Sequence, residues 1–205
     1  MAIFLDTGNM NEIRKYHEMG IISGVTTNPT ILSREGVKGG MDGVKKRSME
    51  IANLISPLPL SVEVTTNEMD RMLQQALDFA KWANNINVKI TIHGPEGELG
   101  NLKVIHELEK KHDVRINVTA MMSAQQCFLA ARAGATYLSI FGGRVNNMGY
   151  NVINEISLLR RLLDSFNLES QIIVGSTREV LNIIEWLDAG AHIVTATPNL
   201  IEGML

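Results

Sequence analysis

The chain has 205 residues, of which 45% are hydrophobic, and it carries 19 basic and 22 acidic residues. This size predicts one globular domain over residues 1–205, and the slightly acidic balance excludes the basic surface typical of nucleic-acid binding. No apolar run is long enough to cross a membrane, and the chain begins with a strand rather than a signal peptide. The single cysteine, Cys127, fits a reducing compartment, so we expect a cytoplasmic protein.

Short apolar segments alternate with amphipathic ones from the first residues onward. The predicted strands are Ala2–Leu5, Ile22–Thr26, Leu60–Val64, Asn87–Ile90, Arg115–Val118, Tyr137–Phe141, Gln171–Gly175 and His192–Ala196. The predicted helices are Met10–Met19, Val44–Ile55, Asn67–Trp82, a segment that ends near His112, Ser123–Ala133, Val152–Phe166, Thr177–Leu187 and a last turn over Asn199–Leu205.

This alternation favours parallel pairing, and eight β/α units on a chain of this size predict a closed α/β (β/α)8 TIM barrel. The last helix looks truncated, because the chain ends at Leu205. A doubly wound open sheet is the alternative, but no glycine-rich fingerprint follows the first strand.

A lysine interrupts the apolar strand Ile86–Thr91, at position 89. Burial disfavours the charged form of an amine, and a neutral amine in a dry pocket attacks carbonyl groups. Lys89 is therefore a candidate for a Schiff base. The alternative is an edge strand on which Lys89 faces water, since lysines often protect exposed edges.

Polar residues lie near the carboxyl ends of most of the predicted strands, which is where (β/α)8 barrels place their active sites. The candidates are Asp6, Thr26, Asn28, Glu63, Lys89, Asn117, Thr119, Ser139, Phe141, Arg144, Ser176 and Arg178. Several of them also have a purely structural interpretation, as a helix cap for Asp6, a turn for Asn28 or solvated surface charges for the arginines.

The candidates after the sixth and seventh strands suit a phosphate. Arg144, Ser176 and Arg178 lie near the usual phosphate position of this fold, and arginine binds phosphate through two hydrogen bonds. The five histidines have no spacing typical of a metal site, so we expect neither a metal nor another cofactor.

The segments Leu5-Asp6-Thr7 and Gly24-Val25-Thr26-Thr27-Asn28-Pro29-Thr30 resemble the transaldolase family, specifically its small-subunit branch, which includes the fructose-6-phosphate aldolases. The resemblance continues along essentially the whole chain, through Val62-Glu63-Val64, Val88-Lys89-Ile90, Asn117-Val118-Thr119, Ser139-Ile140-Phe141 with Arg144, and Gly175-Ser176-Thr177-Arg178.

The resemblance implies a role for each candidate. Lys89 would form the Schiff base with a ketose phosphate, and Asp6 would move the proton during carbon–carbon cleavage. Glu63 and Thr119 would hold and activate a catalytic water. Asn28, Asn117 and Ser139 would bind substrate hydroxyls, and Thr26 and Phe141 would also contact the substrate. The phosphate would be bound by Arg144, Ser176 and Arg178.

The reaction that the resemblance implies moves a dihydroxyacetone unit between sugar phosphates in the pentose phosphate pathway. Sedoheptulose 7-phosphate and glyceraldehyde 3-phosphate would give erythrose 4-phosphate and fructose 6-phosphate. One alternative is an aldolase that releases dihydroxyacetone, and another is a catalytically idle sugar-phosphate-binding barrel. The small branch of the family forms pentamers, often paired as decamers, so we expect a homo-oligomer.

Three positions favour transfer over release. The family's aldolases carry glutamine at position 63, an apolar residue at position 117 and tyrosine at position 141, whereas this chain has Glu63, Asn117 and Phe141. The chain also departs from the family's pattern, because the segment Thr91–Gly100 after the lysine is longer than usual. The given chain also ends at Leu205, before most of the helix that the family places last.

Overall fold

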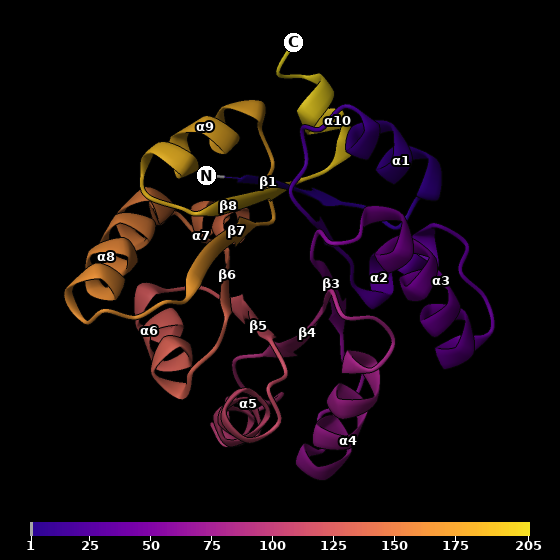
Figure 1. Ribbon diagram of the computed structural model, residues 1–205. Coiled ribbons are helices and arrows are strands. Elements are labelled where there is room, and N and C mark those ends of the chain that lie inside the picture. The colour runs from indigo at the N-terminus through magenta and orange to yellow at the C-terminus, as the bar shows by residue number, and fades with distance from the viewer. Residues whose placement is uncertain (1) are drawn as a thin grey trace.

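The computed structural model describes residues 2–205, and its strands form a closed parallel barrel surrounded by helices (Figure 1). The strands are β1 (Ala2–Asp6), β2 (Val25–Thr26), β3 (Leu60–Glu63), β4 (Ile86–Thr91), β5 (Ile116–Met121), β6 (Tyr137–Phe141), β7 (Gln171–Gly175) and β8 (Ile193–Ala196). Neighbours in the barrel follow chain order, and β8 closes it by pairing with β1. The predicted (β/α)8 fold is confirmed.

The helices are α1 (Met10–Glu18), α2 (Pro29–Arg34), α3 (Gly40–Ile55), α4 (Met69–Ala80), α5 (Gly100–Lys111), α6 (Ala124–Ala133), α7 (Gly142–Asn147), α8 (Val152–Ser165), α9 (Val180–Asp188) and α10 (Pro198–Glu202). Most of them match a predicted segment with shifted ends. Strand β2 is much shorter than predicted.

Two short helices, α2 and α7, lie where the sequence analysis predicts no helix. Helix α2 begins at Pro29, and the Asn28 side chain caps it by accepting a hydrogen bond from the Ile31 amide. Helix α7 follows β6 directly, at Gly142. Both helices have six residues, too few for a helical period to stand out in the sequence.

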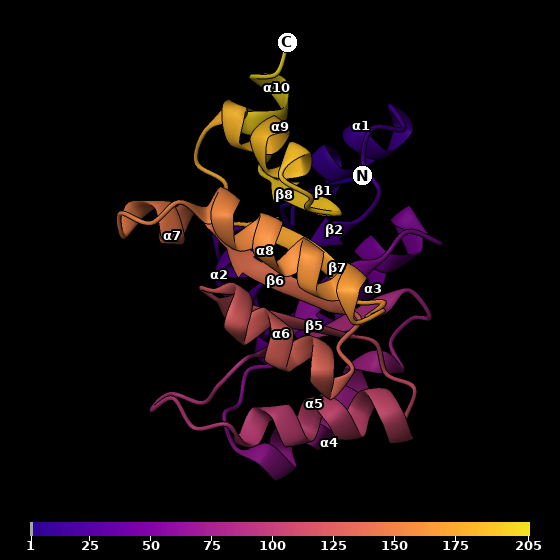
Figure 2. The same cartoon turned by 90° about the vertical axis from the view of Figure 1, so that its left-hand side faces the viewer.

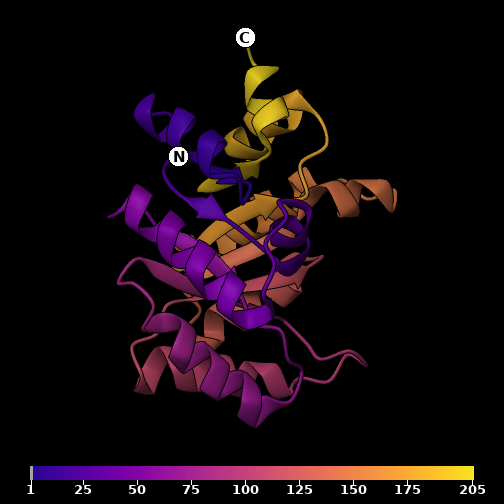
Figure 3. The same ribbon diagram turned by 90° about the vertical axis from the view of Figure 1, so that its right-hand side faces the viewer.

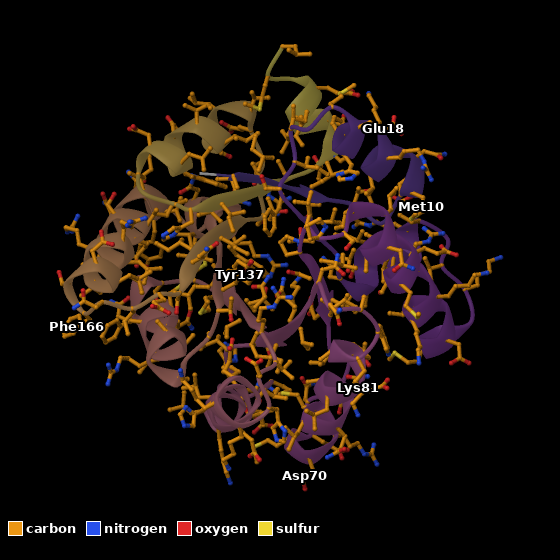
Figure 4. The ribbon with its side chains drawn as sticks, viewed as in Figure 1. Met10, Glu18, Asp70, Lys81, Tyr137 and Phe166 are labelled. Atoms are coloured by element: carbon orange, nitrogen blue, oxygen red, sulfur yellow. The ribbon has the colours of Figure 1, made fainter. Side chains whose placement is uncertain are left out.

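Alternation along the strands divides the apolar residues into two cores. The larger core lies between the strands and the surrounding helices and includes Leu5, Val88 and Ile140. The smaller one comprises the inward-facing residues Phe4, Tyr137, Ile173 and Ile193, together with Ala2. Tyr137 accordingly projects within the ring of strands (Figure 4). These apolar side chains come from β1, β6, β7 and β8, so they fill the part of the barrel interior that these strands surround.

Helix α7 and the connection between β4 and α5 project from the same end of the barrel (Figures 2 and 3). Both follow the carboxyl ends of strands, as does α2. These three segments therefore lie at the mouth of the barrel rather than at its base.

Candidate active site

A cavity of about 550 Å³ opens at the carboxyl ends of the strands. All of the candidate residues predicted from the sequence line it, namely Asp6, Thr26, Asn28, Glu63, Lys89, Asn117, Thr119, Ser139, Phe141, Arg144, Ser176 and Arg178. A volume of this size is typical of small-molecule sites.

Lys89 lies on the inner face of β4, and only 7% of its surface is exposed. A closed barrel has no edge strand, so the interpretation of Lys89 as a solvated edge residue is wrong. Its Nζ donates a hydrogen bond of 3.1 Å to the Thr27 carbonyl and lies 3.1 Å from Oε2 of Glu63. Glu63 is next to Lys89 because β3 and β4 pair with these two residues in register.

Asp6 ends β1 on the other side of the cavity. Thr26 donates a 2.6 Å hydrogen bond to its Oδ1, and the Thr26 oxygen lies 2.6 Å from Oγ1 of Thr195. Because Thr26 gives its only hydroxyl hydrogen to Asp6, Thr195 is the donor in the second contact. Burial raises the pKa of Asp6 above its ordinary value, and this effect exceeds the opposing effects of the Thr26 hydrogen bond and the positive charge of Lys89.

The two carboxylates of the cavity therefore have different surroundings. Glu63 is ion-paired with the lysine, whereas Asp6 accepts a hydrogen bond from a hydroxyl and holds its proton more tightly than an exposed aspartate. Carboxyl groups with such different surroundings can divide the work of an acid and a base.

Amide and hydroxyl groups line the wall beside Lys89. Ser139 on β6 donates a 2.6 Å hydrogen bond to Oδ1 of Asn117 on β5, and Nδ2 of Asn117 donates one of 3.0 Å to Ser61. The hydroxyl of Thr119 is buried and has no hydrogen-bond partner within residues 2–205. This wall can bind the hydroxyls of a sugar, and Thr119 has its hydrogen-bonding capacity available for a water or a substrate.

Arg144, Ser176 and Arg178 gather on the side formed by β6 and β7. The guanidinium carbon of Arg144, on α7, lies 4.8 Å from the centre of the Phe141 ring, so the ring supports the arginine. Ser176 follows β7 directly and has a left-handed backbone, with φ of 60°. Two guanidinium groups and a hydroxyl at one rim can hold a phosphate.

Several residues that line the cavity were not predicted. Arg34 and Thr30 come from α2, Ala120 from the end of β5, and Thr195 from β8. The signal for α2 was Asn28 followed by Pro29, a pair typical of a helix start. Thr195 could have been found from alternation in the last strand, since it shares the inward face of Ile193.

Among residues 2–205 no group of three or more histidine, cysteine, aspartate or glutamate side chains is placed to hold a metal ion. Within the same residues, none of the helices is both long enough and apolar enough to cross a membrane.

Comparisons with known proteins agree with this architecture. Residues 3–205 match the family model described as transaldolase/fructose-6-phosphate aldolase. The chain is 37% identical over 205 residues to probable transaldolase 1 of Bacillus cereus, a match that covers 100% of this chain and 90% of the relative. It is 42% identical over 205 residues to the probable transaldolase of Lactiplantibacillus plantarum, with 100% and 88% covered.

A solved structure with the same architecture is thiamine phosphate pyrophosphorylase from Pyrococcus furiosus, with a TM-score of 0.66 at 11% identity. The match covers 96% of this chain and 85% of that one. At this identity the likeness concerns the fold alone.

Proposed function

The chain belongs to the transaldolase/fructose-6-phosphate aldolase family, and we propose that it is a transaldolase that works through a Schiff base on Lys89. The reaction would take a dihydroxyacetone unit from sedoheptulose 7-phosphate to glyceraldehyde 3-phosphate, giving erythrose 4-phosphate and fructose 6-phosphate. The observation that carries the proposal is the buried lysine in a polar cavity that two carboxylates in different surroundings also line.

In the first step Nζ of Lys89 attacks the C2 carbonyl of the ketose. The carbonyl oxygen leaves as water, and a protonated imine remains between Nζ and C2. Nζ must lose a proton before it attacks, and the Glu63 carboxylate, 3.1 Å away, is placed to accept that proton. Glu63 and the hydroxyl of Thr119 then hold the water that later returns to hydrolyse the imine.

Cleavage of the C3–C4 bond comes next. Asp6 takes the proton of the C4 hydroxyl, the aldehyde leaves, and the electrons of the broken bond move into the imine to give an enamine. A carboxylate that holds a proton tightly is a better base for this transfer, so the raised pKa of Asp6 fits the role. The hydrogen bond from Thr26 orients the carboxylate towards the cavity.

The rest of the cavity would fix the sugar chain. Asn28, Asn117 and Ser139 bind hydroxyls, with Thr26 and Phe141 completing the walls. Arg144, Ser176 and Arg178 bind the phosphate at the far rim. The enamine stays bound until an acceptor aldehyde arrives, and the new bond forms by the same steps in reverse.

The runner-up is an aldolase that protonates the enamine and releases free dihydroxyacetone. We favour transfer because Phe141 presents no hydroxyl to the cavity. A hydroxyl at this position could orient the catalytic water and so help to protonate the enamine. A coupled assay with fructose 6-phosphate, with and without erythrose 4-phosphate as acceptor, separates the two reactions. Turnover that needs the acceptor supports a transaldolase, and equal rates without it support an aldolase.

Borohydride reduction tests the mechanism itself. Incubation with fructose 6-phosphate and borohydride should leave a stable adduct on Lys89, which peptide mass spectrometry locates. An intact chain without an adduct would favour a catalytically idle sugar-phosphate-binding barrel.

We also propose that the protein acts as a homo-oligomer, a pentamer or a pair of pentamers. Helix α9 carries the exposed apolar side chains Leu181 and Ile184 one turn apart. Burying such residues between copies would stabilise an assembly. Light scattering at micromolar concentration measures the mass, and a monomer would contradict this proposal.

A further inference from the structure

The interior of the barrel has a polar side and an apolar side below the cavity. The inward-facing residues of β3, β4, β5 and β6 include the polar Ser61, Asn87, Asn117 and Ser139. The opposite side holds the apolar cluster around Phe4 and Ile193. Asn87 lies two residues before Lys89 on the same strand, so both side chains point into the barrel.

On the polar side, three side chains form a hydrogen-bonded relay, in which each residue donates to the next. Ser139 donates to Oδ1 of Asn117, and Nδ2 of Asn117 donates to Oγ of Ser61. The hydroxyl hydrogen of Ser61 must then go to a further acceptor, and no hydrogen bond donated by Ser61 is found within residues 2–205. The direction of the relay depends on that missing acceptor.

Asn87 has unused polar atoms next to Ser61. Its side chain is completely buried, and neither Nδ2 nor Oδ1 has a hydrogen-bond partner within residues 2–205. Asn87 and Ser61 are register partners on adjacent parallel strands. A buried amide without partners is costly, and an internal water is the usual way to satisfy it when two or more polar groups converge.

We propose that Asn87 binds an ordered water which it shares with Ser61, and that Asn87 is a positioning residue for Asn117. The water accepts the hydroxyl hydrogen of Ser61 and donates to Oδ1 of Asn87. The relay then runs only from Ser139 through Asn117 to Ser61, and the Asn117 amide is held in one orientation.

The orientation of the Asn117 amide affects how the substrate is bound, and this step rests on the proposed function. With the relay in this direction, Asn117 keeps one N–H free to donate and Ser139 keeps an oxygen lone pair free to accept. A ketose C1 hydroxyl can satisfy both groups, because it accepts one hydrogen bond and donates another. Without an acceptor beyond Ser61, the amide can turn over, Ser61 can donate to Oδ1 of Asn117, and Ser139 can present a second donor, which leaves the C1 hydroxyl hydrogen unpaired.

The test uses Asn87→Leu, which has a similar shape and no polar atoms, and Asn87→Thr, whose hydroxyl can hold the same water. We expect Asn87→Leu to lower kcat/KM for fructose 6-phosphate about tenfold, the loss typical of one hydrogen bond. Asn87→Thr should recover most of it. For 1-deoxyfructose 6-phosphate, which has no C1 hydroxyl, Asn87→Leu should act like the wild type.

Stability separates positioning from a structural role. Asn87 makes no direct hydrogen bond to another residue within residues 2–205, so Asn87→Leu should lower the unfolding temperature less than a variant that removes direct hydrogen bonds. The matched control is Asn85→Leu, because Asn85 is also buried but donates to the carbonyls of Ala52 and Leu58 at the base of the barrel. This control should lower the unfolding temperature and affect both ketoses equally. Equal losses on both ketoses for Asn87→Leu would overturn the inference.

A crystal structure of the free wild-type protein provides a readout that does not depend on turnover. Ordered water between Asn87 and Ser61 supports the inference, and its absence at high resolution overturns it. A wild type that carries this water but forms no borohydride adduct would refute only the proposed function.

Discussion

Replacing Arg144 or Arg178 with alanine should lower kcat/KM for phosphorylated substrates much more than for unphosphorylated ones. Each guanidinium is proposed to bind the substrate phosphate, and a lost charge-assisted hydrogen bond is worth about 1.5–3 kcal/mol. This corresponds to a fall of about 10- to 150-fold in kcat/KM for fructose 6-phosphate. Unphosphorylated fructose lacks the group that these arginines bind, so its kcat/KM should change little.

We expect the loss of kcat/KM in Arg144→Ala to lie towards the upper end of that range. Its guanidinium is already held over the Phe141 ring, at 4.8 Å from the ring centre, so it loses little freedom when the phosphate arrives. Arg144→Lys keeps the charge but loses the planar fork and much of the stacking, and should give an intermediate loss.

The assay compares kcat/KM for fructose 6-phosphate and for fructose in each variant. Arg161→Ala is the matched control, because Arg161 is an exposed residue of α8 away from the cavity and the variant loses the same charge. Equal losses for both substrates, or a loss no larger than that of Arg161→Ala, would show that the phosphate site is elsewhere.

Three further predictions concern the reacting groups. Lys89→Met should abolish turnover and leave the circular dichroism unchanged, and residual activity above about 1% of wild type would exclude Lys89 as the nucleophile. Burial raises the pKa of Asp6, so this carboxyl contributes stability at acidic pH that is lost as the pH rises through its folded-state pKa. Asp6→Asn should be inactive because it removes the proposed base, and in urea unfolding it should gain more stability over the wild type at pH 7 than at pH 4. Phe141→Tyr should raise the release of free dihydroxyacetone, measured with a coupled reductase, and an unchanged ratio of release to transfer would show that this ring does not control the outcome.

The sequence was most informative about which residues gather at the mouth of the barrel. Strand alternation and the (β/α)8 order place Asp6, Glu63 and Lys89 at one end, because parallel strands end together. The contact between Glu63 and Lys89 could not be predicted in the same way. It depends on β3 and β4 pairing without an offset, and short apolar strands do not specify their register by composition.

Local backbone conformation was the other feature that the sequence did not reveal. Ala120 and Ser176 both line the cavity with positive φ, of 62° and 60°, although neither residue type favours this region. At Ala120 the pairing of β5 with β6 shifts between Val118 and Met121, so an irregularity turns the end of β5 next to Thr119. Glycine or asparagine at either position would have been a signal, and alanine and serine give none.

The two sides of the barrel interior suggest why the polar wall is tolerated. Buried polar groups beside Lys89 cost stability unless they are paired, whereas the cluster of Phe4, Tyr137, Ile173 and Ile193 fills the opposite side with apolar contacts. The hydrogen bonds of the polar wall run across strands, from β6 to β5 to β3, so each one also joins two elements that carry proposed site residues. A substitution that makes this wall apolar is therefore expected to affect stability and substrate binding differently. The barrel can stay folded, while the side chains that face the sugar lose the hydrogen bonds that hold them in place.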